Sequence, residues 1–499
     1  MAEVEYKAYD IDTGYLFPPS LADFLGSEDE VHIFREVTEQ LEVGGLDSGY
    51  SGMGQHPYHP RLLLRLLMWG MANRVVSTRR IEVLARRDVS FIYLAGGQRP
   101  DYRTLARFRR RNAAEIEKLF KETVLLCARL GMVALGHIAL DGTKLKAHTS
   151  RHKAMSYGRM KEEEERLTGE VEGLMRQMDA MDREEDEAFG QDANGYNLSE
   201  ELQRREARLE KIQKLREELE REQSAITDKE QRSFADPDAR MMLMKRGEFD
   251  YAYNGQVCVD EAHGVIVAGD LSNEAFDGGH LPGIVEEVRE LREMLGKGDE
   301  DLTEMTGDSG YFSAENMEED GKGVELLIAS GREGKEEQAE TRDRLYTLEN
   351  FTYIKGRDSW RCPGGRALVR QKKLASRGRP LLRRYVCLDC EGCPLKPRCL
   401  RPGEERRTLL VKRKQLITSE MRSRLKEPEK QAIYRKRKWV AEQNIGNIKE
   451  GIGFRGFTVR GKMFARAQWL FVLAVHNVMK AVRFLATLKR REEALAMAW

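Results

Sequence analysis

Apolar residues recur at helical spacing in three successive stretches between residues 59 and 112, LLLRLLMWGM, RRIEVLARR and RTLARFRRR, with short breaks such as AGGQRPD between them. This pattern predicts a small DNA-binding domain of helix-turn-helix type within a helical amino-terminal domain over residues 1–130. Apolar positions around Leu16, Leu21 and Phe24 predict further short helices.

A different pattern begins at residue 131, where short apolar runs alternate with one amphipathic helix. Runs that end at turn residues predict strands, and the turn DEAHG joins two of them into a hairpin. The predicted strands are residues 137–140, 253–260 and 265–268, a strand leading to Asp308, and 324–330; helices are predicted over 281–295 and 434–450. This order predicts an α/β domain over residues 131–499, with a mixed sheet covered by helices.

Two insertions interrupt this domain. In residues 155–232, apolar residues recur at sevens and GQDANG supplies a turn, which predicts an antiparallel helical hairpin with charged outer faces. One stripe is Met160, Leu167, Val171, Leu174, Met178 and Met181, and the other is Leu202, Leu209, Ile212, Leu219 and Ile226. A dimerisation arm, a clamp on DNA and a spacer all remain open as roles.

The second insertion, residues 331–426, holds five of the seven cysteines, within WRCPGG and YVCLDCEGCPLKPRC. Cysteine pairs two residues apart grip a tetrahedral Zn²⁺ through a tight turn. Five cysteines compete for four positions, and four thiolates leave no open position for catalysis. The segment is therefore predicted to be a small zinc-ribbon-like module with a structural ion, whereas Cys127 and Cys258 stand alone in apolar surroundings as core residues.

Charge is segregated along the 499-residue chain, although its formal net value is only +1. Residues 61–111 and 355–466 are rich in Lys and Arg, whereas the runs KEEEE and DREEDE are acidic. Such segregation is typical of a protein that binds a polyanion. Arg103, Arg107 and Arg110 share one face of the third predicted helix, where they suit phosphates and guanine edges of double-stranded DNA.

Three acidic residues have contexts that predict convergence. Asp141 closes the apolar run HIALD, Asp308 follows LTEMTG, and Glu442 lies within the polar helix YRKRKWVAEQNIGNIKE. Two aspartates at strand ends and one helical glutamate can meet at one site. Oxygen ligands suit a pair of Mg²⁺ ions, or Mn²⁺, roughly 4 Å apart around a phosphate. The predicted chemistry is phosphodiester hydrolysis or strand transfer.

Several strings, in order along the chain, resemble those of DDE transposases of bacterial insertion sequences. They are PDYRTLARFRRRN, DGTKLKA, ADPDARMM, YNGQVCVDEAHGVIVA, GDSGYFSAEN, GFRGF and AVHNVMK. The spacing of Tyr434, Arg437, Glu442 and Lys449 is similar to the signature helix of that family. The resemblance implies an RNase H-like fold, with Asp141, Asp308 and Glu442 as catalytic metal ligands and with Arg437 and Lys449 on DNA phosphates.

The resemblance also implies metal ligands and partners. It favours Cys362, Cys390, Cys393 and Cys399 as zinc ligands and leaves Cys387 as a bystander, with Cys387 in place of Cys390 as the alternative. The expected partners are the terminal repeats and the target DNA, bound by a homodimer in the cytoplasm at the nucleoid.

Membrane and ATP-driven functions are not expected. The longest apolar run, residues 469–475, is too short to span a bilayer and predicts a buried helix. The chain has no GxxxxGK[ST] string. Two alternatives to a transposase stay open, which are a domesticated DNA-binding regulator without catalysis and a nuclease of the same fold that cuts without joining.

Overall fold

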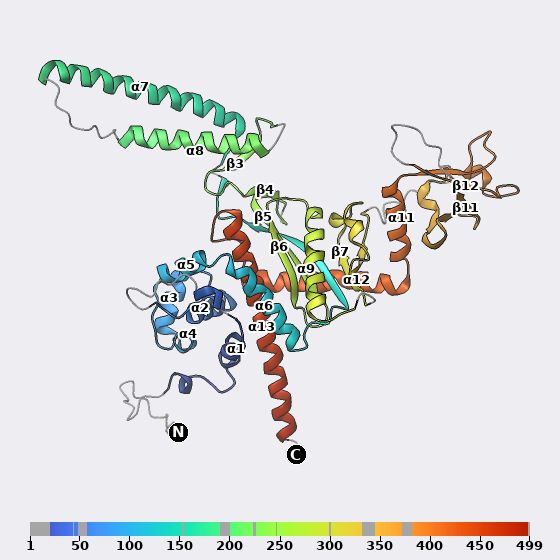
Figure 1. The fold of residues 1–499 in the computed structure, drawn as a ribbon, viewed down its shortest axis with the longest axis horizontal. Helices are drawn as coiled ribbons and strands as arrows, with labels where there is room; N and C mark the ends of the chain where they lie inside the picture. The colour runs from blue at the N-terminus through green and yellow to red at the C-terminus, as the bar shows by residue number, and fades with distance from the viewer. Residues whose placement is uncertain are drawn as a thin grey trace, which may run out of the picture.

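A computed structural model describes residues 20–42, 44–47, 57–151, 154–189, 200–222, 226–245, 247–298, 301–331, 345–371 and 382–497. Leu16 and the turn predicted at residues 190–195 lie outside these ranges, as do the side chains of Met178, Met181 and Leu202. Figure 1 shows a central body from which a long pair of helices and a small β-rich module project in different directions.

The body is built on a six-stranded mixed sheet in which β5, β1, β7 and β8 are successive neighbours. The strands are β1 (His137–Lys146), β4 (Arg240–Leu243), β5 (Phe249–Asp260), β6 (Ile266–Ser272), β7 (Thr303–Gly307) and β8 (Val324–Ile328). β5 runs antiparallel to β1, to β4 and to β6, whereas β7 is parallel to both β1 and β8. β5 is therefore the one strand of this sheet that runs opposite to the other five, and β1, β6, β7 and β8 point their carboxyl ends in the same direction.

Helices pack on this sheet, as the α/β expectation requires. α12 (Pro428–Gly446) contacts β1, β5 and β7, while α9 (Leu281–Met294) contacts β6. α13 (Lys462–Met497) contacts β6 and also α6 (Glu115–Arg129). By length and composition α13 could cross a membrane, but 72% of its apolar window is buried inside the protein. The prediction of a buried helix at residues 469–475 is confirmed, because α13 is a core helix.

The amino-terminal helices share their core with the sheet. They are α1 (Glu30–Glu39), α2 (Pro60–Ala72), α3 (Thr78–Arg87), α4 (Val89–Leu94) and α5 (Tyr102–Arg111), after a 3-10 turn at Leu21–Phe24. One continuous cluster of buried side chains runs from Val31 through Leu66 and Ile138 to Val482. The sequence pattern did not predict α4, which begins where the Asp88 carboxylate accepts hydrogen bonds from the Ser90 and Phe91 amides.

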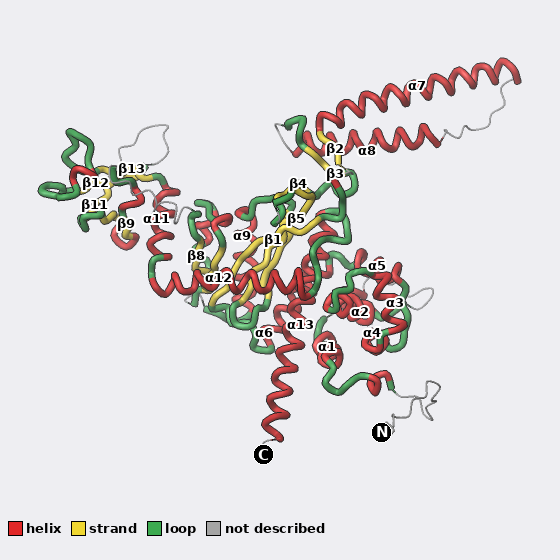
Figure 2. Tube along the Cα trace, turned by 180° about the vertical axis from the view of Figure 1, so that it is seen from behind, coloured by secondary structure: helices red, strands yellow, loops and turns green. Residues whose placement is uncertain are grey.

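The first insertion forms two helices that lie side by side, α7 (Tyr157–Phe189) and α8 (Glu200–Glu222) (Figure 1). At its base, β2 (Ala154–Ser156) pairs antiparallel with β3 (Gln231–Ser233). Met160, Leu167 and Ile212 are buried between the helices, and Arg216 pairs with Glu164 across them at 2.8 Å. The pair projects away from the sheet, and none of the side chains that the structure describes in α7 and α8 belongs to the sheet's core (Figure 2).

The second insertion has a core of its own, around Trp360, Tyr385 and Leu409. Five short strands form an antiparallel sheet in the order β13-β12-β11-β10-β9. They are β9 (Thr352–Ile354), β10 (Ser359–Arg361), β11 (Ala367–Arg370), β12 (Arg383–Cys387) and β13 (Thr408–Val411). The short helix α10 (Lys396–Cys399) follows β12, and α11 (Arg413–Leu425) leads back toward α12 and the body.

Candidate active site

The parallel pairing of β1 with β7 brings two of the predicted aspartates together. Ala139 lies opposite Thr306 in the register, so Asp141 and Asp308, each two residues further on, fall side by side on the same face. Asp308 directly follows β7, as predicted, and its carboxylate accepts a hydrogen bond from the Gly310 amide at 2.8 Å.

The prediction that Asp141 ends a strand was wrong. β1 continues to Lys146 because its polar half, DGTKLK, pairs antiparallel with β5, and Asp141 lies opposite Val257 in that ladder. The pairing with β7, however, stops at Ala139. Asp141 therefore lies where β1 extends beyond its parallel neighbour, which leaves room beside its carboxylate at the edge of the sheet.

Electrostatic effects show that the two carboxylates are neighbours. Burial raises the pKa of Asp141 to about 6; the Gly142 amide and Arg437 oppose this shift, whereas the charges of Asp308 and Asp277 add to it. The pKa of Tyr311 is raised well above its ordinary value, first by burial and then by Asp277, Asp141 and Asp308. The charges of three aspartates thus act on one buried hydroxyl, which places all three in the neighbourhood of Tyr311.

Asp277, which sequence reasoning missed, is the third of these aspartates. Its Oδ1 accepts hydrogen bonds from the side-chain amides of Asn254 at 2.6 Å and Gln256 at 3.0 Å, and Lys144 Nζ lies 3.6 Å away. A Cβ at Gly142 would come within 2.5 Å of that same oxygen, so β1 needs a glycine beside Asp141. Asp277 is therefore held in place from β5 and β1.

Gly310 gives a second measure of how closely the carboxylates approach one another. A Cβ built at this glycine would lie 2.9 Å from Asp308 Oδ1 and 3.4 Å from Asp277 Oδ2.

The sequence did contain a signal for Asp277, because this residue follows the predicted strand that became β6. β6 points toward the same edge as β1 and β7, so an acid just beyond its end falls among the other two.

The predicted third ligand, Glu442, lies on α12, and in the sequence it falls between Arg437 and Lys449, two basic residues whose charges interact with that of Asp141. Arg437 lowers the pKa of Asp141. Burial lowers the pKa of Lys449, as does the charge of Lys245, while Asp141 acts to raise it. The Glu442 side chain itself is exposed and, within the described residues, makes no hydrogen bond or ion pair. The structure thus joins Asp141 and Asp308, and brings Arg437 and Lys449 near them, without fixing the Glu442 carboxylate by any contact.

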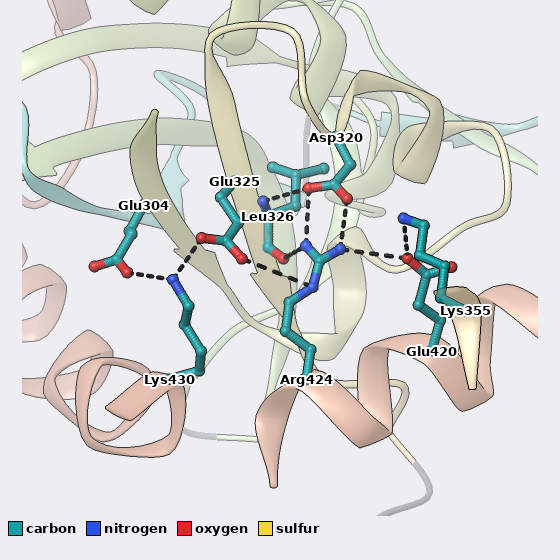
Figure 3. A network of polar contacts seen from close by, with 8 residues as sticks. All are labelled: Glu304, Asp320, Glu325, Leu326, Lys355, Glu420, Arg424 and Lys430. Carbon is teal, nitrogen blue, oxygen red and sulfur yellow. Dashed lines mark hydrogen bonds and ion pairs between the residues drawn. The ribbon is translucent and has the colours of Figure 1, made fainter. Parts of the chain in front are cut away.

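Figure 3 shows how the start of α12 is held to the sheet. At the end of α11, Arg424 donates to both oxygens of Asp320, at 2.9 and 2.8 Å, and to the carbonyl of Leu326 at 3.1 Å. Lys430, in the first turn of α12, bridges Glu304 of β7 and Glu325 of β8. These contacts fix where α12 begins relative to β7, the strand that leads to Asp308.

The donors at this edge suit a hard divalent cation. Asp141, Asp277 and Asp308 all lie in the neighbourhood of Tyr311, and the absence of a Cβ at Gly142 and Gly310 leaves room for the carboxylates of Asp277 and Asp308. In the described part of the chain, no group of three or more His, Cys, Asp or Glu side chains is arranged so that it could hold a metal ion. The three aspartates fit Mg²⁺ or Mn²⁺ in their chemistry, and their side chains would have to move to bind such an ion together.

The five clustered cysteines line one small cavity in the second insertion. The sulfur atoms of Cys362 and Cys393 both lie near Gly364, because a Cβ built at that glycine would be 3.7 Å from the first and 3.6 Å from the second. Burial raises the pKa of Cys399, and the nearby thiols of Cys390, Cys362 and Cys393 add to this. Burial, and then a hydrogen bond with Cys390, raises the pKa of Cys387 to about 12. The thiol donor set suits Zn²⁺, and the contact between Cys387 and Cys390 leaves open which of those two would bind.

The three arginines singled out in the sequence lie on the exposed face of α5, opposite the buried Leu105 and Phe108. The Arg103 guanidinium lies over the Tyr102 ring, 5.7 Å from its centre, and the Arg110 guanidinium lies 5.3 Å from the centre of the Phe464 ring. Arg107 makes no hydrogen bond or ion pair within the described residues. All three present charge at the surface.

Two family models match the chain. Residues 361–482 match the model described as a transposase DDE domain, and residues 20–111 match the model described as a transposase domain. The first span contains Glu442, Lys449 and the clustered cysteines, and the second contains α5; Asp141, Asp277 and Asp308 lie outside both. No curated protein and no solved structure matches the chain.

Proposed function

We propose that this chain, which belongs to the DDE transposases of bacterial insertion sequences, binds the ends of its element as double-stranded DNA and catalyses cleavage and strand transfer there. The observation that carries the proposal is the side-by-side placement of Asp141 and Asp308 beside α12, the helix within the matched DDE domain. The sheet order, with one antiparallel strand between β6 and β1, supports assignment to the RNase H-like fold.

In this proposal, Asp141, Asp308 and Glu442 hold two Mg²⁺ or Mn²⁺ ions. When bound, such ions activate the attacking water or 3′ hydroxyl and stabilise the departing 3′ oxygen. Arg437 and Lys449 contact the phosphates next to the cut. Glu442 must turn from solvent toward the aspartates, and the packing of α12 on β1 places its helix beside the strand that carries Asp141.

A structural Zn²⁺ in the second insertion is part of the same proposal. Cys362, Cys393 and Cys399 supply three thiolates, and Cys390 supplies the fourth, with Cys387 as the alternative. On this view the ion stabilises the module, and the protein acts as a homodimer on DNA at the nucleoid.

The test uses the full-length protein, a labelled duplex carrying the terminal repeat of the element, and Mg²⁺. Joined products support a transposase, nicks alone indicate a nuclease of the same fold, and binding without cleavage indicates a regulator. Asp308→Asn should abolish cleavage and leave DNA binding unchanged, whereas Asp301→Asn, a change at an exposed position before β7, should alter neither. Cleavage by Asp308→Asn at the wild-type rate would overturn the assignment of the metal site.

A further inference from the structure

Two hollows beyond the far end of β1 form one basic trough. The first, of about 470 Å³, lies between α5 and the start of α13, and the second, of about 580 Å³, lies beside the end of β1. His148 and Arg460 line both hollows, so the two adjoin each other. No Asp or Glu lines either of them. A concave surface with only cations and neutral groups favours an anionic ligand.

Three guanidinium groups of the trough, those of Arg109, Arg110 and Arg460, make no ion pair with a carboxylate within the described residues. Burial lowers the pKa of Arg109, and none of the described groups pairs with it. Arg110 lies over the Phe464 ring, and Arg460 donates to the backbone carbonyl of His148 at 3.2 Å. The other two cations of the trough are already paired, Lys146 with Asp250 at 2.7 Å and Arg455 with Glu450. Arg109 is the partly buried one of the three, and a buried charge without a counter-ion destabilises the protein unless a ligand supplies the anion.

The wall of the trough is a fixed loop, the GFRGF string that the catalytic proposal does not use. Phe454 and Phe457 are buried, which leaves Arg455 and Arg460 on the exposed side. The Phe457 amide donates to the Lys146 carbonyl at 2.8 Å, and a Cβ at Gly456 would lie 2.9 Å from that oxygen. The loop therefore docks on the end of β1 only with a glycine at this position.

The ADPDARMM string holds the far end of the same loop. Asp236 accepts a hydrogen bond from the Gly461 amide at 3.0 Å, and Asp238 accepts one from the Lys462 amide at 2.7 Å. Asp236 also feels the charge of Arg460, although burial dominates its pKa, which is raised. The loop is thus anchored at both ends, and the positions of its cations are set before any ligand binds.

We propose that this trough seats the phosphate backbone of the transposon-end duplex between α5 and the catalytic aspartates. The inference rests on the proposed function and adds a contact to it. Lys146 lies five residues beyond Asp141 along β1, a distance of roughly 17 Å at the usual rise of a strand. DNA rises 3.4 Å per base pair along its axis, so the contact between the trough and the phosphate backbone should fall about five base pairs from the cut.

The experiment compares full-length variants on a duplex carrying the terminal repeat, by fluorescence anisotropy over a range of salt concentrations. Arg110→Ala/Arg460→Ala should raise the Kd about tenfold or more and lower the slope of log K against log salt by about 1.8, since each lost phosphate contact removes about 0.9. Arg110→Lys/Arg460→Lys keeps both charges and should retain most of the slope. Hydroxyl-radical footprinting should show protection about five base pairs from the cut, lost only in the alanine variant.

Lys489→Ala/Arg490→Ala is the matched control, because it removes two exposed cations from the far end of α13, about 38 Å along that helix from Phe464. Wild-type behaviour of the control, together with the losses in the alanine variant, supports the proposal. If the alanine variant binds like the control while the wild type binds and cuts, the trough assignment is wrong and the proposed function stands. If the wild type neither binds nor cuts the duplex, the proposed function fails, and the trough assignment fails with it.

Discussion

Replacing Arg424 by Ala should loosen the attachment of α11 and α12 to the sheet. The Arg424 side chain is only 15% exposed, and it satisfies both oxygens of Asp320 as well as the Leu326 carbonyl. It also lies 3.4 Å from Glu420 and 3.9 Å from Glu325 (Figure 3). Burial acts to lower its pKa, yet the bonds to Asp320 and the nearby carboxylates leave that pKa raised. The alanine variant would leave several carboxylates close together without their shared cation.

The magnitude follows from how deeply the pair is buried. Breaking a fully buried pair costs about 3 to 5 kcal/mol, whereas an exposed pair contributes about 0 to 1 kcal/mol. Asp320 is 21% exposed and keeps a hydrogen bond from the Leu326 amide at 2.8 Å, so its loss is partly compensated. We therefore expect a cost of about 2 to 3 kcal/mol, which corresponds to a roughly 30-fold to 150-fold larger equilibrium constant for local opening.

Hydrogen exchange of the backbone amides in α11 and β8, followed by mass spectrometry, measures this local opening. Arg413→Ala is the control on the same helix, because Arg413 pairs with Glu318 at 2.8 Å with both side chains more than half exposed. It should change protection by less than about 1 kcal/mol. Equal protection losses in the two variants would refute the reasoning, as would strict additivity of Arg424→Ala with Asp320→Ala, because directly paired residues should show coupling.

Three further outcomes are expected. Burial raises the pKa of Glu287 to about 7 from 4.5, with Asp270 adding to the shift and the Gly269 amide opposing it, so the protonated form favours folding. The free energy of unfolding should therefore fall by up to about 3 kcal/mol as the pH rises from 4.5 to 7, and urea titrations of Glu287→Gln should lack this fall. Asp277→Asn should keep DNA affinity but raise the Mg²⁺ concentration needed for cleavage at least about tenfold; an unchanged requirement would exclude Asp277 from the metal site. Zinc analysis should find about one ion per chain in Cys387→Ser and none in Cys390→Ser, and the reverse result would exchange their roles.

The sequence predicted a feature correctly where the contacts that produce it join residues close together in the chain. The Asp308 site follows from a strand that ends at a glycine and an aspartate, and both features are visible in consecutive residues. The end of β1 was placed too early because DGTKLK looks polar. Its strand conformation depends on pairing with β5, more than a hundred residues away. Local pattern cannot report such a pairing.

The missed features have the same origin. Asp277 belongs to the site because β6 runs parallel to β1, a relation that appears only when the sheet is assembled. The strands β9 to β13 are three to five residues long, too short for an alternating pattern to stand out from the cysteine-rich turns. The basic trough is likewise invisible in sequence, because Arg110, His148 and Arg460 come from three separate segments.

The two ends of α12 explain how an exposed Glu442 can still serve a defined site. The first turn is held by Lys430 on Glu304 and Glu325. Just beyond the last turn, Asn447 hydrogen-bonds His476 of α13 at 3.1 Å, and His476 in turn contacts the Gly264 carbonyl at 3.1 Å.

Burial lowers the pKa of His476 to about 4, so this imidazole stays neutral near pH 7 and the anchor does not change with pH in that range. With its backbone fixed at both ends, α12 gives Glu442 a set position beside β1. Ordering the Glu442 side chain then costs rotamer entropy of up to about 2 kcal/mol. A bound cation readily offsets a cost of that size. The fixed helix therefore fits the proposed role of Glu442, in which its carboxylate stays in solvent until the metal and the DNA bind.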